Sequence, residues 1–171
     1  MPITEILARN ANLYADEIAL VEVTPETQDR REISWRRFDD DANRFAHLLL
    51  TRGLGKGKKV AILLTNCLEW LPIYFGILKT GALAVPMNYR YTAEEIAYCL
   101  NLADADAIVF GPEFVDRIAG VLGQISRVEL LVHVGVDVPP FAESYRELVA
   151  TASARPPQIA VTDTDEAAIY F

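Results

Sequence analysis

Short apolar segments alternate with helical patterns through the middle of the chain, and this alternation limits the available folds more than any other feature of the sequence. The apolar segments carry almost no polar residues, which is typical of strands covered on both faces in a parallel sheet. Strands and helices in alternation, with short connections, favour right-handed crossovers. The sequence therefore predicts an α/β fold, a layered and mostly parallel sheet with helices on both faces, whose strands lie at 60–64, 82–86, 107–110 and 128–134.

Amphipathic helices are expected between these strands and ahead of the first one, because apolar residues recur there with the period of an α-helix. Ser34 is a suitable N-cap residue, and Thr92 has the spacing of a capping box with Glu95. Asn66 and Glu69 have the same spacing and predict another capping box. The expected helices lie at 34–52, 66–81, 92–102 and 113–122.

Elements are also expected before and after this core in the sequence. Ahead of it, 18–23 and 31–34 have the pattern of an antiparallel hairpin, whose long polar tip contains Pro25, Thr27 and Asp29. Behind it, Ser144 with Glu147 predicts a short capped helix.

The last residues, 167–171, have the pattern of an apolar strand with no turn after it. A strand left unpaired at the end of a chain invites aggregation, which is unusual for a complete protein. We therefore expect residues 1–171 to form a single subdomain, the amino-terminal fragment of a larger domain.

The composition argues against several classes of protein. With 51% hydrophobic and 23% charged residues, the 171-residue chain is able to bury one core and is too apolar for a disordered protein. A net charge of −8 with scattered basic residues argues against a nucleic-acid partner. No apolar stretch reaches the roughly 20 residues of a transmembrane helix, and no signal peptide is visible. Cys67 and Cys99 are expected to be reduced, which favours a cytoplasmic protein.

Several patterns that suggest chemistry have simpler interpretations. The glycine and lysine cluster at 53–58 lacks the spacing, the Ser or Thr, and the preceding strand of a phosphate-binding loop, so we expect a plain turn. His47 and His133 have no cysteine or carboxylate at nucleophile or metal spacing, so both are expected to be structural or surface residues. The acidic run at 39–41 is expected to form a solvated helix face.

Arg90 is the strongest candidate for a binding residue. It follows the expected strand at 82–86, with Asn88 in the same loop. Open parallel sheets bind ligands beyond the carboxyl ends of their strands, and a planar, permanently charged guanidinium suits phosphate. The alternative is a surface arginine that hydrogen-bonds its own loop, and the sequence leaves both interpretations open.

The same segment carries a resemblance to a known family. Residues 78–90 match L-K-x-G-A-x-x-V-P-x-N-x-R, and together with 91–98 they resemble the second core motif of the adenylate-forming enzymes, with the acyl-CoA synthetases as the most similar branch. Upstream, I-S-W-R-R-F at 33–38 and A-N-R at 42–44 are similar to the first motif of that family. The end of the chain, 164–171, is similar to the strand that leads into the family's glycine-rich phosphate loop.

The resemblance implies an acid:CoA ligase in the intact protein. A carboxylate, fatty or aryl, would attack the α-phosphorus of ATP with Mg²⁺ present, giving acyl-AMP and pyrophosphate, and the CoA thiol would then displace AMP. It also implies that Arg90 lies near the CoA nucleotide. The family's phosphate loop, adenine-binding motifs and catalytic lysine have no counterpart in this sequence. For the fragment alone we therefore expect no catalytic residue, no metal site, no bound cofactor and no activity.

Alternatives to this interpretation stay open. Asn88 favours a CoA ligase over a peptide-synthetase adenylation domain, in which an Asp is more usual at this position. Luciferase-like and peptide-synthetase relatives remain candidates. A standalone α/β module for binding or dimerisation, without catalysis, is a further alternative, and homo-oligomer formation is left open.

Overall fold

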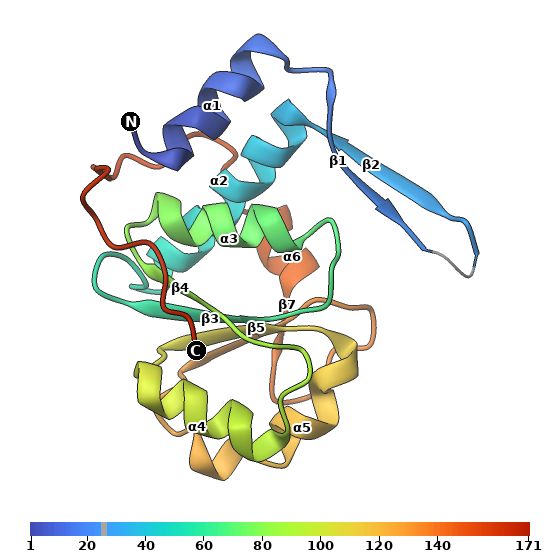
Figure 1. Cartoon of the computed structure of the whole chain (residues 1–171), viewed down its shortest axis with the longest axis vertical. Coiled ribbons are helices and arrows are strands. Elements are labelled where there is room, and N and C mark those ends of the chain that lie inside the picture. The colour runs from blue at the N-terminus through green and yellow to red at the C-terminus, as the bar shows by residue number, and fades with distance from the viewer. Residues whose placement is uncertain (25–26) are drawn as a thin grey trace.

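A computed structural model describes residues 1–24 and 27–171, and it shows a parallel sheet of five strands (Figure 1). The strand order is β4-β3-β5-β6-β7, and every pair of neighbours is parallel. The α/β prediction and the four predicted strands are confirmed, whereas the two-residue β7 is too short to give a recognisable pattern. The strands are β3 Lys59–Leu63, β4 Leu83–Pro86, β5 Ala107–Phe110, β6 Leu130–His133 and β7 Glu143–Ser144.

Helices cover both faces of this sheet (Figure 1). One face carries α2 Trp35–Thr51, α3 Trp70–Lys79 and α6 Tyr145–Ala150, and the other carries α4 Ala93–Ala103 and α5 Val115–Ala119. The helix expected at 113–122 is divided, because α5 is flanked by the short 3₁₀ segments η1 Pro112–Phe114 and η2 Leu122–Gln124.

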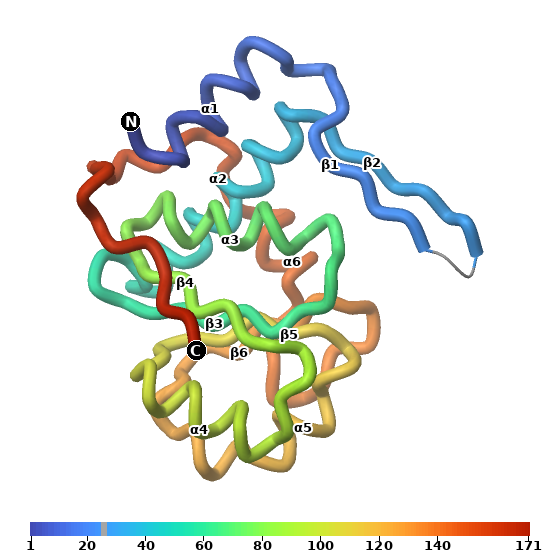
Figure 2. The backbone as a smooth tube through the Cα atoms, viewed as in Figure 1, coloured from blue at the N-terminus to red at the C-terminus, as the bar shows by residue number. Residues whose placement is uncertain are grey.

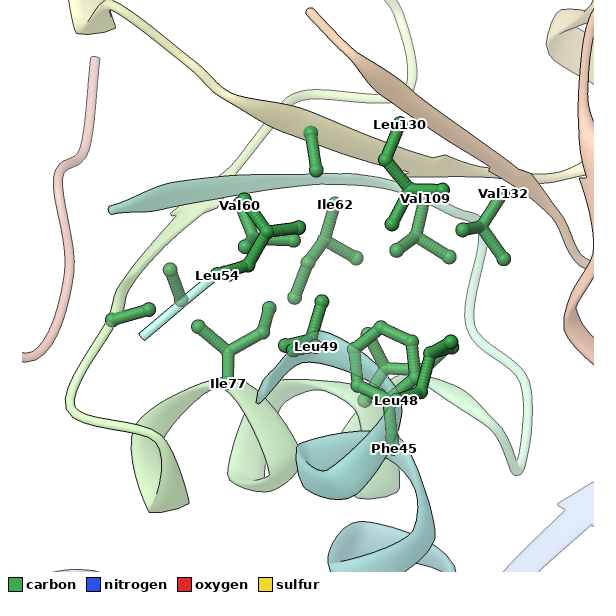
Figure 3. Close-up of a cluster of buried hydrophobic side chains, with 14 of the residues drawn as sticks. Phe45, Leu48, Leu49, Leu54, Val60, Ile62, Ile77, Val109, Leu130 and Val132 are labelled. Carbon is green, nitrogen blue, oxygen red and sulfur yellow. The ribbon is translucent and has the colours of Figure 1, made fainter. Parts of the chain in front are cut away.

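Alternate side chains of each central strand enter two separate cores. In β3, Val60 and Ile62 point toward α2 and α3, whereas Ala61 and Leu63 point toward α4. Figure 3 shows the first core, in which the labelled side chains of α2 and α3 lie beneath the sheet strands. Because both faces are buried, the strands need apolar residues at every position, which explains their continuous apolar sequence.

The amino-terminal part packs on the outer side of α2. It consists of α1 Ile3–Leu13 and an antiparallel hairpin of β1 Ile18–Val23 and β2 Arg30–Ser34, which projects away from the sheet (Figure 1). The hairpin prediction is confirmed for the described residues, and Pro25, expected in its tip, lies outside them. The helix α1 was not predicted. It buries only a few residues, among them Leu7 against Phe38.

Three of the four predicted helix caps are present. Ser34 Oγ accepts a hydrogen bond from the Arg37 N–H, and Ser144 Oγ accepts one from the Glu147 N–H, both at 3.3 Å. The prediction of a cap at Asn66 is wrong, because α3 begins at Trp70 with no side-chain cap. The Glu69 carboxylate that the cap would have used lies 3.5 Å from the Arg31 guanidinium of the hairpin.

The fourth cap, at the start of α4, is a complete capping box. Thr92 Oγ1 accepts a hydrogen bond from the Glu95 N–H at 3.3 Å, and the Glu95 carboxylate accepts one from the Thr92 N–H at 2.8 Å. These bonds pair two amides that the helix itself leaves free. We expect Thr92→Ala to lower the free energy of unfolding by about 1 kcal/mol.

Urea titration followed by circular dichroism measures this difference. Thr92→Ser is the matched control, since serine keeps the accepting oxygen, and it is expected to unfold close to the unsubstituted chain. Equal stability of the Ala and Ser variants would contradict the role of the cap.

The end of the chain lies beside the sheet at its β4 edge (Figure 2). The Ala84 N–H donates to the Ala167 carbonyl at 3.0 Å, and the Ile169 N–H donates to the Ala84 carbonyl at 2.9 Å. The strand predicted at 167–171 is therefore reduced to one parallel bridge, at Ala168. Its direction fits the sheet, but Tyr170 and Phe171 are exposed and pair with no strand in the described part of the chain.

A buried ionic network joins α2 to α3, and it corrects the prediction that the acidic run at 39–41 is solvated. Asp39 is 8% exposed, and its Oδ1 accepts a hydrogen bond from Lys79 Nζ at 2.6 Å. Lys79 also donates to Asn43 Oδ1 at 2.6 Å, and Asn43 Nδ2 donates to Asp39 Oδ2 at 3.1 Å. The close packing of α3 on α2 buries this side of the acidic run, which no pattern within α2 reveals.

Candidate functional site

The candidate site is the loop of residues 87–91, at the carboxyl end of β4. Its first residue is anchored to the sheet, because the Met87 N–H donates to the Ile62 carbonyl at 2.9 Å. Asn88 Oδ1 then accepts a hydrogen bond from the Arg90 N–H at 3.0 Å, which tightens the turn. The loop ends at the capped start of α4. Arg90 is thus placed beyond a strand's carboxyl end, as the sequence predicts, in a turn that Asn88 shapes.

The Arg90 guanidinium is exposed and contacts Tyr89 of its own loop. Its Nε donates to the Tyr89 hydroxyl at 3.1 Å, and its central carbon lies 5.4 Å from the centroid of the Tyr89 ring. No carboxylate lies within ion-pair distance of it in the described part of the chain. The arrangement presents an uncompensated positive charge beside a half-exposed aromatic ring, which suits a ligand with a phosphate and a planar group.

A second arginine, Arg117 of α5, contacts the same loop. Arg117 Nη1 donates to the Tyr89 carbonyl at 2.9 Å and to the Tyr91 carbonyl at 3.0 Å. These carbonyls flank Arg90. Sequence reasoning missed Arg117, because the contact joins α5 to a loop nearly thirty residues earlier and has no local pattern.

A crevice crosses the same sheet edge where the strand order reverses. From β3 the chain moves to β4 on one side and to β5 on the other, and open α/β sheets bind ligands beyond such a point. A cleft of about 440 Å³ lies there, and its charged lining consists of three carboxylates and two arginines: Glu22, Glu69, Glu113, Arg31 and Arg146. The Thr65 hydroxyl donates to Glu113 at 2.6 Å. Arg31 pairs with Glu22 and Glu69, so charges of both signs meet in the crevice. Arg90 has no carboxylate partner among the described residues, and we therefore take the β4 loop as the candidate for phosphate.

The glycine and lysine cluster is a turn, as predicted. Gly53 and Gly57 have φ of 72° and 83°, a left-handed geometry that favours glycine. Lys56 pairs with Asp165 and Lys58 pairs with Asp106, so both charges are already compensated. The cluster has no features of a phosphate site.

The histidines and cysteines have structural environments. His47 Nε2 lies 2.9 Å from the Arg155 carbonyl, and His133 is fully buried against Phe110, where burial lowers its pKa. Cys99 is buried and Cys67 half-buried, both as free thiols, and burial raises the pKa of Cys67 to about 12. A thiol with such a pKa is a poor nucleophile at neutral pH.

The described residues hold neither a cluster of metal ligands nor a membrane-spanning helix. They contain no group of three or more His, Cys, Asp or Glu side chains that is able to hold a metal ion. None of their helices is long and apolar enough to span a bilayer.

The chain is similar in sequence to one enzyme family and to several CoA ligases. A model of the AMP-binding enzyme family matches residues 7–171. A 3-oxocholest-4-en-26-oate–CoA ligase of Rhodococcus rhodochrous is 28% identical over 99% of this chain. A crotonobetaine/carnitine–CoA ligase of Citrobacter koseri is 38% identical over 61% of this chain. These alignments cover 30% and 20% of the two relatives, so the chain spans less than a third of their length.

Solved structures show the same arrangement of elements. An anthranilate CoA ligase in complex with anthranoyl-AMP superimposes with a TM-score of 0.89 at 26% identity, over 98% of this chain and 31% of that structure. A fatty acyl CoA synthetase of Mycobacterium tuberculosis superimposes with a TM-score of 0.84 at 27% identity, over 98% of this chain and 32% of that structure. Since the family model covers nearly the whole chain, this protein belongs to the AMP-binding enzyme family.

Proposed function

We propose that this chain is the amino-terminal subdomain of an ATP-dependent acid:CoA ligase. The carboxylate of the acid attacks the α-phosphorus of ATP, forming acyl-AMP and releasing pyrophosphate. The CoA sulfur then attacks the acyl carbon and AMP leaves. The observation that carries the proposal is the family match over residues 7–171, together with relatives whose names specify acid:CoA ligases.

Within this reaction we assign the β4 loop to the CoA nucleotide. Arg90 offers a guanidinium with no carboxylate partner among the described residues, and the exposed face of Tyr89 lies beside it. A phosphate on Arg90 would gain charge-assisted hydrogen bonds. ATP and its Mg²⁺ are assigned to parts of the enzyme outside these 171 residues, because the sequence holds no glycine-rich phosphate loop.

The substrate is proposed to be a fatty or aryl acid, the classes named for the fatty acyl CoA synthetase and the anthranilate CoA ligase, whereas the carnitine and cholestenoate ligases are named for other acids. Cytoplasmic localisation and the oligomeric state remain predictions. The direct test of the function is incubation of the enzyme carrying this segment with ATP, Mg²⁺, CoA and a panel of carboxylic acids. Formation of acyl-CoA and AMP supports the proposal, and acyl-AMP without any thioester in the presence of CoA contradicts it.

The role of Arg90 is tested by Arg90→Ala in that enzyme. Because a hydrogen bond to a charged group contributes about 1.5–3 kcal/mol, the KM for CoA is expected to rise about ten- to a hundred-fold. The KM values for ATP and for the acid are expected to change little, since neither substrate contacts this loop. Steady-state kinetics with each substrate varied in turn measures the difference.

Arg9→Ala is the matched control. Arg9 is an exposed arginine of α1 with no ion-pair partner among the described residues, and it lies on a different part of the molecule. An equal change in the KM for CoA in both variants, or no change in Arg90→Ala, removes Arg90 from the CoA site.

A further inference from the structure

We infer that Arg117 is a positioning residue for CoA binding, which holds the backbone on both sides of Arg90 in its binding conformation. This inference rests on the proposed function, in which Arg90 contacts the CoA nucleotide. It adds a residue from a different element, α5, that acts on the nucleotide through the loop.

The contacts of Arg117 join the loop to the core of the subdomain. Its Nη1 donates to the carbonyls of Tyr89 and Tyr91 at 2.9 and 3.0 Å. Its guanidinium carbon lies 5.4 Å from the centroid of the Phe114 ring, and Phe114 is 1% exposed. The arginine is thus seated on a buried ring while it binds the residues immediately before and after Arg90.

Side-chain packing anchors the two ends of the loop, because Met87 is buried and Tyr91 packs against the core beside α4. In the described part of the chain, the backbone hydrogen bonds of residues 88–91 to another element are those donated by Arg117. The remaining bonds, from the Arg90 N–H to Asn88 and from the Tyr91 N–H to the Asn88 carbonyl, stay within the loop. The loop's own bonds shape the turn, Met87 and Tyr91 anchor its ends, and Arg117 holds the two backbone carbonyls that flank Arg90.

By holding the loop in one position, Arg117 favours ligand binding. A ligand that meets a loop already in its bound conformation avoids the entropic cost of ordering it. Without Arg117, the loop would sample other positions and the fraction with Arg90 in place would fall. The apparent affinity for CoA would fall by the same fraction.

The test is Arg117→Ala in the active enzyme. We expect the KM for CoA to rise about five- to ten-fold, while kcat and the KM for ATP stay within about two-fold. In an Arg90→Ala background, Arg117→Ala is expected to have almost no further effect on CoA, because the residue that it positions is gone. A purely structural arginine would instead lower stability and leave the KM for CoA unchanged, and that result would overturn the inference.

Arg127→Ala is the matched control. Arg127 Nε donates to the Asp104 carbonyl at 3.0 Å, so it also binds a loop backbone, but at the amino-terminal edge of the sheet. It is expected to leave the KM for CoA unchanged. An increase in the KM for CoA equal to that of Arg117→Ala would mean that general loosening of the fold causes both increases, and it would overturn the inference.

A second measurement keeps the inference testable if Arg117→Ala folds poorly. Arg117→Met removes the charge and every donor while keeping the aliphatic part of the side chain, and hydrogen exchange of the chain reports the loop directly. We expect faster exchange of the amides at 88–91 with unchanged exchange in β3 and β5. Unchanged exchange at 88–91 would overturn the inference.

The two proposals fail in different ways. An Arg90→Ala enzyme with normal CoA dependence removes the nucleotide site itself. Strong dependence on Arg90 with none on Arg117 retains the site and removes only the positioning role.

Discussion

Lys79→Met is expected to lower the free energy of unfolding of this chain by about 3–5 kcal/mol, the typical cost of removing one partner of a buried ion pair. Lys79 is 7% exposed and donates to Asp39 and Asn43, both at 2.6 Å. Methionine fits the same space, so the loss comes from charge. The substitution leaves the Asp39 carboxylate buried, with Asn43 Nδ2 as its one remaining side-chain donor in the described part of the chain. Urea unfolding monitored by fluorescence measures the change.

Two controls separate the buried charge from packing. Asp39→Asn combined with Lys79→Met removes the orphaned charge and is expected to recover much of the loss. Arg52→Met breaks the exposed pair with Glu143, in which the two side chains are 40% and 43% exposed, and is expected to cost at most about 1 kcal/mol. Equal losses in Lys79→Met and Arg52→Met would contradict the argument that burial makes the Asp39–Lys79 pair important.

Gly76→Ala is expected to destabilise the chain by about 1–3 kcal/mol, the typical cost of overpacking. In an exposed helix this substitution would stabilise by about 1 kcal/mol, because alanine is the better helix former. In α3, however, the new Cβ would lie 2.9 Å from the Ala42 carbonyl oxygen and 3.0 Å from Phe45 Cβ in α2. The two helices would have to separate, which would weaken the core beneath the sheet. Thermal and urea unfolding both report the change.

Gly123→Ala is the matched control for this prediction. A Cβ at Gly123 meets no atom within 4 Å, and its φ is not positive. Its substitution is expected to be neutral or to stabilise by up to about 1 kcal/mol, through the reduced entropy of the unfolded chain. If Gly76→Ala proves as stable as Gly123→Ala, the close approach of α2 and α3 is not required.

Much of the fold is readable in the sequence because its causes are local. The strand of residues 60–64 is recognisable from a continuous apolar run, and the start of α4 from two side chains three residues apart. Asn66 marks the limit of such reasoning. It has the same spacing to Glu69, yet Glu69 lies near Arg31 of the hairpin and the helix begins later. A carboxylate that pairs with an arginine from another element, as Glu69 does with Arg31, does not form the cap that its local spacing predicts.

In the candidate site, too, one residue was predictable from the sequence and another was not. Arg90 was predictable, because its place after an apolar strand and Pro86 is visible in the sequence. Arg117 was not, because its two carbonyl partners lie 28 and 26 residues earlier in the chain. Only the parallel pairing of β3 with both β4 and β5 brings the loop after β4 close to α5.

The sequence by itself determined the alternation of strands and helices from β3 to β6, most of the helix caps and the position of Arg90, since each depends on residues within a few positions of one another. Three contacts were decided by the tertiary structure alone. They are the buried ion pair of Asp39 with Lys79, which are forty residues apart, the close packing at Gly76, and the hydrogen bonds from Arg117 to the Arg90 loop. Apolar periodicity specifies which face of an element is buried, but it does not specify which element covers that face. Polar contacts between two elements depend on which elements pack together, so they are not visible in the sequence of either element.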